Sequence, residues 1–488
     1  MVLLAAVLGL QSADAASIGS LAAPIEVAFH IGNVDLGLLA TASTVVAVVT
    51  CLPFGVLVDR YNRTKLLQVM AVIWGVSTVT SGASSSFGML LGVRVFQGGL
   101  TAIVGPALAS LAGDLFPSDE RGRLWGYVLT GELGGAGVGI LVTGVVSGIA
   151  DWRVALSLLG LPAFVLAGAL HRWLPEPARG GQARLGRGAT AIRTAGAAGA
   201  SRRIPERIVL EEPSRIELQA ERLGARPYPR TVVEGDGELD LWSAVRYVLR
   251  IRSNDALILA SGIGYFFVQG LETFMELFLR HRYGVGQSAA SLLFLVIASG
   301  ALLGVVVSGQ VADRLVAGGR ATGRIVVGAV TFAATTVVFA PAVLAHSLVF
   351  ATVALALAAV LLGAVNPPVD MARLDVVPSF LWGRAEAIRT TLRQGLQGFA
   401  PLLFGLVSTA FGGRPGGLGS GVDTAAAAAP SATGRGLGTT FAIFSVAMLL
   451  AGAVLWASRR SYLRDVVAAR RSDERRAGGP VDCGPPGG

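Results

Sequence analysis

The sequence predicts an all-α integral membrane protein with twelve transmembrane helices in two six-helix bundles. Two bulk observations support this prediction: 53% of the 488 residues are hydrophobic and only 15% are charged, whereas soluble domains carry about 25% charged residues. The third observation is that apolar runs of roughly 20 residues, the length that crosses a bilayer, recur along the chain. Composition alone therefore places the chain among multi-pass membrane proteins.

The apolar runs fall into two sets. The first set lies at 2–28, 35–58, 65–83, 87–113, 122–148 and 154–173. The second set lies at 255–279, 286–311, 324–345, 349–374, 383–411 and 439–458. We therefore predict an N-terminal bundle over residues 1–173 and a C-terminal bundle over residues 251–458.

Basic residues are concentrated in every second loop. These loops and flanking segments lie at 60–65, 121–123, 314–324, 373–384 and 459–460, and the central segment is also rich in Arg. Because cytoplasmic loops carry the excess of Lys and Arg, both chain termini are expected on the cytoplasmic side of a bacterial plasma membrane. The first run could alternatively be a signal peptide, but it lacks a basic n-region, and removing it would break the alternation of loop charges.

Two polar segments flank the second bundle. Residues 174–250 form a cytoplasmic linker that ends in LWSAVRYVLRIR. In this stretch Leu241, Val245 and Val248 recur at helical spacing among arginines, which predicts an amphipathic helix on the membrane surface, with an ordinary solvated connector as the alternative. Residues 459–488 are expected to form a cytoplasmic tail that is disordered.

The two halves of the sequence repeat each other. A shift of 261 residues places Asp114 on Asp375 and Gly134 on Gly395, and a shift of 254 places Asp59 on Asp313. Internal duplication of this kind is common in secondary transporters, where the substrate site lies between the halves near the middle of the bilayer. A solute carrier is therefore the leading functional hypothesis.

The stretch GVLVDRYNRTK between the second and third predicted helices resembles the Gly-x-x-x-Asp-Arg-x-x-Arg-x-Lys signature of the major facilitator superfamily (MFS). A shortened copy, GQVADR, occupies the equivalent loop of the second half. The resemblance implies the MFS fold, alternating access around a central cavity, and a conformational clasp at the cytoplasmic ends. The clasp residues would be Gly55, Asp59, Arg60, Arg63, Lys65, Gly309, Asp313 and Arg314.

Within that superfamily, GLLATASTVVAVVTCLPFGVLVDRYNR together with GDLFPSDERGR looks most like the Spinster-like branch. Members of this branch export lysophospholipids or sphingoid phosphates, so the resemblance implies an amphipathic substrate. The chain departs from the branch pattern at two places. Asp14 is followed by Ala15 rather than Arg, and Thr101 occupies the position where the branch has an acid.

Acidic residues inside predicted helices are candidates for proton coupling, because a charge at membrane depth costs about 2.5–3.5 kcal/mol on insertion scales. Asp14, Glu132 and Glu272 are the three candidates. For Asp14 the alternative is a structural role, bonded to Ser12 or Ser17 or paired with Arg94. For Glu132 the alternative is a buried hydrogen bond to the backbone or to Thr130.

Polar and aromatic residues facing the expected cavity are candidates for substrate binding. The set is Asp14, Arg94, Gln97, Phe266, Gln269, Glu272, Arg393 and Gln397. Arg94 could bind an anionic headgroup, since guanidinium pairs with phosphate or carboxylate, or it could form a permanent salt bridge. Arg393 could equally pair with Asp370, and the phenylalanines of the seventh helix could simply pack in the core.

Acids near the predicted outer ends carry weaker functional signals. Glu276 lies one turn from Glu272 on the same helix face, and we expect it to reach the outer interface. Glu26 and His30, near the outer end of the first helix, are expected to be solvated.

Several classes of function are disfavoured. The sequence shows no catalytic constellation, no metal-ligand spacing and no disulfide framework, because its two cysteines, Cys51 and Cys483, are isolated. We expect no enzyme activity, no cofactor and no nucleic-acid partner, and a monomer whose partners are the lipid bilayer and a small amphipathic substrate. The driving ion is expected to be H⁺, although Na⁺ would also use carboxylates. Proton-coupled export is the leading hypothesis, with a drug/proton antiporter or a non-transporting sensor or scramblase as alternatives.

Overall fold

The computed structural model describes the chain except for residues 116–120, 178–214, 229–230, 233–240, 413–429 and 477–488. The N-terminal half contains α1 (Val2–Ser20), α2 (Ala22–Phe29), α3 (Asn33–Arg60), α4 (Arg63–Gly82), α5 (Phe87–Leu115), α6 (Arg121–Ile149) and α7 (Trp152–Trp173). The connecting segment contains α8 (Arg215–Arg222) and α9 (Leu241–Val248). The C-terminal half contains α10 (Arg252–Tyr283), α11 (Gln287–Ala317), α12 (Gly323–Leu344), α13 (Leu348–Gly363), α14 (Asn366–Val376), the 3-10 turn η3 (Ser379–Leu381), α15 (Trp382–Gly398), α16 (Ala400–Ala410) and α17 (Pro430–Arg476).

Each predicted apolar run coincides with one helix or with two consecutive helices. Among the described residues, ten helical stretches are long and apolar enough to cross a membrane. The two predicted runs outside this set are α4, which carries Arg63 and Lys65 in its first turn, and the pair α15–α16. The all-helical membrane architecture is confirmed.

Prolines divide two of the predicted helices. The α13–α14 pair is interrupted just before Pro367 and Pro368, which stand in the first turn of α14. The α15–α16 pair is interrupted at Phe399, and Pro401 stands in the first turn of α16. Proline lacks an amide hydrogen, and the first turn of a helix accommodates it most readily because the amides there have no partner within the helix.

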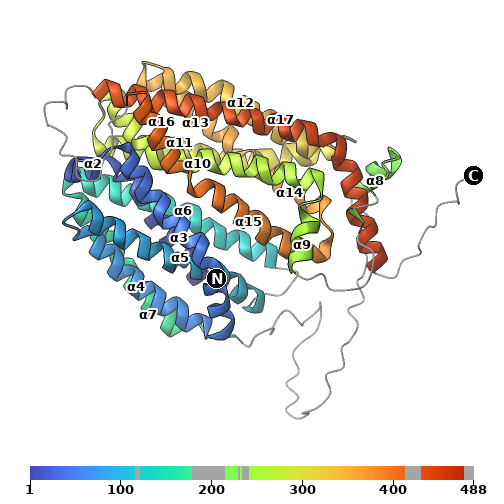
Figure 1. The fold of residues 1–488 in the computed structure, drawn as a ribbon, viewed down its shortest axis with the longest axis horizontal. Coiled ribbons are helices and arrows are strands. Elements are labelled where there is room, and N and C mark those ends of the chain that lie inside the picture. Colours follow the sequence, from blue (N-terminus) through green and yellow to red (C-terminus); the bar gives the residue numbers. More distant parts are fainter. Residues whose placement is uncertain (116–120, 178–214, 229–230, 233–240, 413–429, 477–488) are drawn as a thin grey trace, which may run out of the picture.

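The two halves lie side by side as separate helical bundles (Figure 1). Within the first bundle α1 packs on α6, α3 on α5 and α4 on α7, and within the second α10 and α12 pack on α17 and α11 on α13. Contacts between the halves run through α3 with α16, α6 with α11, and α1 with α10. We call the end where α1 and α10 finish the outer end and the opposite end the cytoplasmic end, following the distribution of basic loops.

Three glycines bring backbones of the two halves together. A methyl group at Gly19 would collide with the carbonyl oxygen of Glu272, one at Gly37 with that of Pro401, and one at Gly405 with that of Asn33. Close approach of this kind is the main use of small residues in membrane helices. The halves are therefore in backbone contact along the outer parts of α1, α3, α10 and α16.

The segments flanking the second bundle differ in part from the prediction. A helix is present at the predicted place as α9, where it packs on α15 with Ala244 and Val248 buried and Trp242 68% exposed; its position on the membrane surface stays a prediction. The predicted disordered tail is wrong as far as Arg476, because α17 continues to that residue. There Val466 is buried and Arg470 forms ion pairs with α8, so packing outweighs the polar composition. The first part of the predicted linker, residues 178–214, lies outside the described residues.

Candidate functional site

Asp14 and Arg94 form a buried ion pair within the N-terminal half. Asp14 on α1 is 6% exposed, Arg94 on α5 is 3% exposed, and Arg94 Nη1 lies 3.1 Å from Asp14 Oδ2. Arg94 Nη2 also approaches Ser17 Oγ at 3.4 Å. Asp14 therefore has the structural partner that the sequence offered as an alternative, although Asp14 Oδ1 and Arg94 Nε have no hydrogen-bond partner among the described residues.

Gln97 lies one turn beyond Arg94 on α5 but points toward a neighbouring helix of the same half. Its side chain is 2% exposed, and its Nε2 donates to Thr78 Oγ1 of α4 at 2.9 Å. In this conformation the amide nitrogen of Gln97 is engaged inside the bundle. The structure does not bring Gln97 together with the substrate-binding candidates of the C-terminal half.

Glu132, Glu272 and Arg393, which we call the central charged set, come from both halves. Glu132 on α6 interacts electrostatically with Arg393 on α15 and with Glu272 on α10. Both glutamate side chains are exposed although their helices are membrane spans. At a rise of 1.5 Å per residue, Glu132 lies about 16 Å from the start of α6 and Glu272 about 16 Å from the end of α10. The two glutamates therefore stand deep in the membrane spans and are exposed, whereas Arg393 is half-buried.

The internal repeat explains part of this arrangement. Glu132 and Arg393 are separated by the repeat shift of 261 residues, so an acid in one half faces a base at the equivalent place in the other. The Arg393 guanidinium also lies over the Tyr265 ring of α10, 4.1 Å from its centroid. Asp370, the alternative partner expected for Arg393, instead forms an ion pair with Arg389 at 2.8 Å.

The remaining substrate-binding candidates lie on α10 and α15. Gln269 and Gln397 are half-buried on the same two helices as Glu272 and Arg393. Phe266 packs its ring 5.5 Å from Phe444 and 5.9 Å from Phe404, centroid to centroid. Phe266 therefore belongs to an aromatic cluster inside the C-terminal half, which is the core-packing alternative. The outward continuation of this cluster contains Phe267, Phe274, Phe278, Phe339 and Phe441.

Polar contacts join the two halves at the outer end. Gln287 Nε2 of α11 donates to the carbonyl oxygen of Ser20 at the end of α1. Asn33 Nδ2 of α3 donates to Ser408 Oγ of α16 at 2.8 Å. We call these four residues the outer gate. Because one hydrophobic core also includes residues of α1, α3, α10 and α17 there, the outer end is closed.

Two acids next to the outer gate are more buried than the sequence predicted. Glu276 was expected to reach the outer interface, but it is 2% exposed and accepts hydrogen bonds from Ser291 Oγ at 2.7 Å and Gln287 Nε2 at 3.2 Å. Glu26 was expected to be solvated, but it is 1% exposed, with its Oε2 3.6 Å from His281 Nε2. Both side chains are covered because the two halves close at the outer end. The sequence of one helix does not show this burial. His30 is exposed, as predicted.

At the cytoplasmic end of the N-terminal half, Arg63 is a buried hub of the predicted clasp. It is 1% exposed and donates to Glu176 Oε1 at 2.9 Å and to Ser110 Oγ at 2.7 Å. Burial alone would raise the pKa of Glu176, but hydrogen bonds from the Thr64 backbone and from Arg63 hold it below its usual value. Arg60 and Lys65 are exposed, and the exposure of Gly55 and of the Asp59 side chain lies outside what the structure describes.

The C-terminal half repeats this hub with different partners. Arg324, which the 261-residue shift relates to Arg63, binds Asp375 Oδ1 at 2.6 Å, and Tyr462 donates to the same carboxylate. Asp313 lies 3.7 Å from Arg324 and is 72% exposed. Gly309 and Arg314 are on α11, and Arg314 is exposed. The described clasp contacts thus stay within one half.

Sequence reasoning did not single out Gln287, Ser20, Asn33 or Tyr265. Their roles depend on which helices meet across the halves, and a polar residue near a helix end carries no sign of that. The Gly-rich composition of the contacting helices was the one available signal.

Among the described residues, no group of three His, Cys, Asp or Glu side chains could hold a metal ion.

Known proteins share both the sequence pattern and the fold. Residues 4–401 match the Major Facilitator Superfamily family model. The puromycin resistance protein pur8 of Streptomyces alboniger is 32% identical over 157 residues, covering 30% of this chain and 31% of pur8. The protein spinster of Drosophila melanogaster is 30% identical over 154 residues, covering 31% of this chain and 25% of spinster. The chain thus matches about a third or less of either relative's length.

Solved structures match over almost the whole chain. A bacterial homologue of the human lysosomal transporter Spinster, in an inward-facing and occupied conformation, has a TM-score of 0.70 at 20% identity and covers 95% of this chain and 97% of its own. A D-xylose–proton symporter has a TM-score of 0.63 at 15% identity, covering 93% and 96%. At these identities the structures show the fold. With the family match over most of the sequence, they establish that the chain is a membrane transporter of the Major Facilitator Superfamily.

Proposed function

We propose that this transporter couples the export of an amphipathic anion, such as a lysophospholipid, to protons. It would work by alternating access between two six-helix bundles with twelve transmembrane helices, both termini in the cytoplasm, in a bacterial plasma membrane. The closed outer gate and the clasp contacts confined to single halves at the cytoplasmic end support an inward-facing state for this structure. That is the state in which a cytoplasmic substrate would enter.

The observation that carries the coupling proposal is the exposure of Glu132 and Glu272 inside membrane spans. A carboxylate at membrane depth is costly, so it is expected to bind a proton or a cationic partner. The two glutamates interact with each other, and Glu132 also interacts with Arg393. A proton on one glutamate would relieve their repulsion. Asp14, also a coupling candidate, is already neutralised by Arg94 and is the weaker choice.

The substrate proposal rests on the chemistry around Arg393. Its guanidinium can bind a phosphate or carboxylate oxygen, and in this conformation it lies over Tyr265 without an acid in contact distance among the described residues. Tyr265 and Gln269 on α10 and Gln397 on α15 are half-buried. An anionic headgroup on Arg393 would compete with Glu132 for the guanidinium, so substrate binding would be linked to the proton affinity of Glu132.

The proposal is tested with proteoliposomes that contain the purified full chain and an imposed pH gradient. Wild-type protein should accumulate labelled lysophospholipid against its gradient. Glu272→Gln should lower this accumulation about ten-fold or more, the usual size of a coupling between two sites. Glu221→Gln, on the surface of α8, is the matched control and should behave as wild type. Accumulation that Glu272→Gln leaves unchanged would exclude Glu272 from coupling.

A polyspecific drug/proton antiporter is the second candidate, and the similarity to a puromycin resistance protein favours it. The same proteoliposomes separate the two. Transport of a hydrophobic cation that lysophospholipid does not inhibit would support the antiporter, since a cation would use the glutamates and not Arg393. Lipid movement that only equalises the lipid concentrations on the two sides, with or without a pH gradient, would instead indicate a scramblase.

A further inference from the structure

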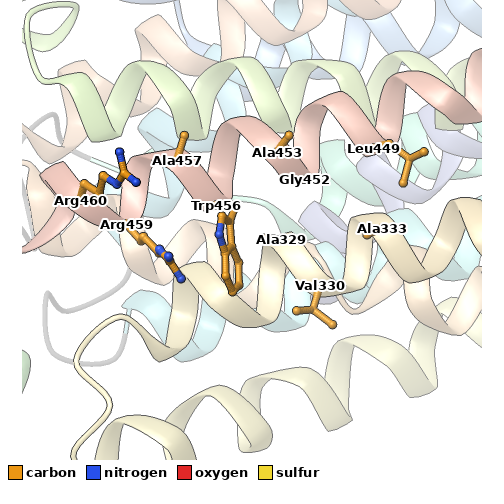
Figure 2. Close-up of a pocket in the computed structure, with 10 residues that line it drawn as sticks. All are labelled: Ala329, Val330, Ala333, Leu449, Gly452, Ala453, Trp456, Ala457, Arg459 and Arg460. Carbon is orange, nitrogen blue, oxygen red and sulfur yellow. The ribbon is translucent and has the colours of Figure 1, made fainter.

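A groove lies between α12 and α17 in the C-terminal half (Figure 2). It has a volume of about 500 Å³. Its floor consists of small residues, and a methyl group at Gly452 would approach the carbonyl oxygen of Ala329. Neither helix contributes to the central charged set, so this groove is separate from the proposed substrate path.

The groove joins an apolar trough to two arginines. Figure 2 shows Arg459 and Arg460 at one end and Leu449 at the other. Along α17 this distance is about 16 Å at 1.5 Å per residue, close to half of the roughly 30 Å hydrocarbon core of a bilayer. The walls are exposed apolar side chains, with Val330 at 55% and Trp456 at 43% exposure. The trough therefore has the length of one leaflet.

The two arginines have no acid within ion-pair distance among the described residues, and Arg460 is exposed. The Arg459 guanidinium lies over the Trp456 ring at 4.1 Å from its centroid. This contact directs the charge toward the groove and leaves its hydrogen-bond donors available. Arg459 and Arg460 stand at the cytoplasmic end, where anionic headgroups attract basic residues and basic pockets between helices bind them.

We propose that this groove is a binding site for one anionic phospholipid of the cytoplasmic leaflet. The phosphate would bind Arg459 and Arg460, and one acyl chain would lie along the trough over Gly452 and Ala453 beside Trp456. A lipid fits better than a soluble anion because the charged end continues directly into an apolar channel inside two membrane spans. The bound lipid would stabilise the packing of α17 against α12.

The test measures binding of dioleoyl phosphatidylglycerol to the detergent-purified full chain by native mass spectrometry, with dioleoyl phosphatidylcholine as the neutral lipid. Each arginine near a membrane surface contributes about 5-fold to anionic lipid affinity. The pair Arg459→Gln and Arg460→Gln should therefore weaken phosphatidylglycerol binding about 30-fold. Arg459→Lys with Arg460→Lys should retain most of the affinity.

A second variant tests the acyl-chain position independently of charge. Ala453 is exposed in the groove, so Ala453→Trp should fill the trough and weaken phosphatidylglycerol binding while both arginines remain. The matched charge control is Arg172→Gln with Arg222→Gln, two exposed arginines outside the groove. This control should bind as wild type.

Several outcomes would overturn the proposal. Unchanged affinity in the Arg459 and Arg460 pair, or an equal loss in the control pair, would show that the lipid responds only to overall charge. Competition by soluble glycerol phosphate, with Ala453→Trp unaffected, would show a soluble-anion site. A lipid-independent dimer that Ala453→Trp dissociates would show that the groove holds a second copy of the chain.

Discussion

The membrane part of this transporter holds two groups of charged residues in opposite ways. Asp14 and Arg94 lie in one half, buried, in direct contact at 3.1 Å. Glu132, Glu272 and Arg393 are divided between both halves, and the two glutamates are exposed. A charge pair that is complete within one bundle keeps its partner when the bundles move relative to each other. Charges that face each other across the bundles change their surroundings with every movement, so they are suited to coupling.

Breaking the buried pair should have the largest effect on stability. Asp14→Asn leaves Arg94 without its counter-ion in a buried site, which costs about 3–5 kcal/mol. The free energy of unfolding, measured by denaturant titration of the purified protein in detergent, should fall by that amount. Adding Arg94→Met to Asp14→Asn should recover most of the loss, because the pair is then replaced by neutral groups. A loss in the double variant equal to that of Asp14→Asn would contradict a structural pair.

A change at the interface between the halves should have an intermediate effect. Gly19→Ala places a methyl group against the carbonyl oxygen of Glu272, and overpacking of this kind costs about 1–3 kcal/mol. The strain is relieved when the outer gate opens. In a background without Cys51 and Cys483, a cysteine introduced by Asn33→Cys, at a position that is now buried, should react faster with an impermeant maleimide when Gly19→Ala is present.

The control for Gly19→Ala is Gly92→Ala on α5. A methyl group at Gly92 meets no atom within 4 Å, and alanine is the better helix former by about 0.5–1 kcal/mol. This variant should therefore be at least as stable as wild type and should leave the maleimide reaction rate unchanged. Equal rates in the Gly19→Ala and Gly92→Ala proteins would show that the outer gate does not depend on close approach at Gly19.

Neutralising a glutamate of the central charged set should have the smallest effect on stability. Glu272→Gln removes a charge that is exposed and repelled by Glu132, so the free energy of unfolding should change by no more than about 0.5 kcal/mol. The same denaturant titration measures this change. A loss as large as that of Asp14→Asn would mean that Glu272 is a structural group, and the contrast between the two charged groups would disappear.

Apolar length, loop charge and a local motif were enough to predict the membrane class, the helical segments, the duplication and the family. The 261-residue shift also relates Glu132 to Arg393. Sequence reasoning left Asp14 with several possible partners, and it wrongly predicted that Glu26 and Glu276 are exposed at the outer end. Those outcomes depend on which helices meet across the two halves.

Which ionisable residues are paired and which are exposed depends on how the helices pack in three dimensions. The pairing of Asp14 with Arg94 requires α1 and α5 to bring together residues eighty positions apart, and the covering of Glu276 requires α10, α11 and the end of α1 to close at the outer gate. The arginines of α17 likewise form a candidate lipid-binding site only because α12 packs alongside at Ala329 and forms the other wall of the groove. The energy of a charge in a membrane depends on its neighbours in space, and one-dimensional spacing along a helix does not specify them.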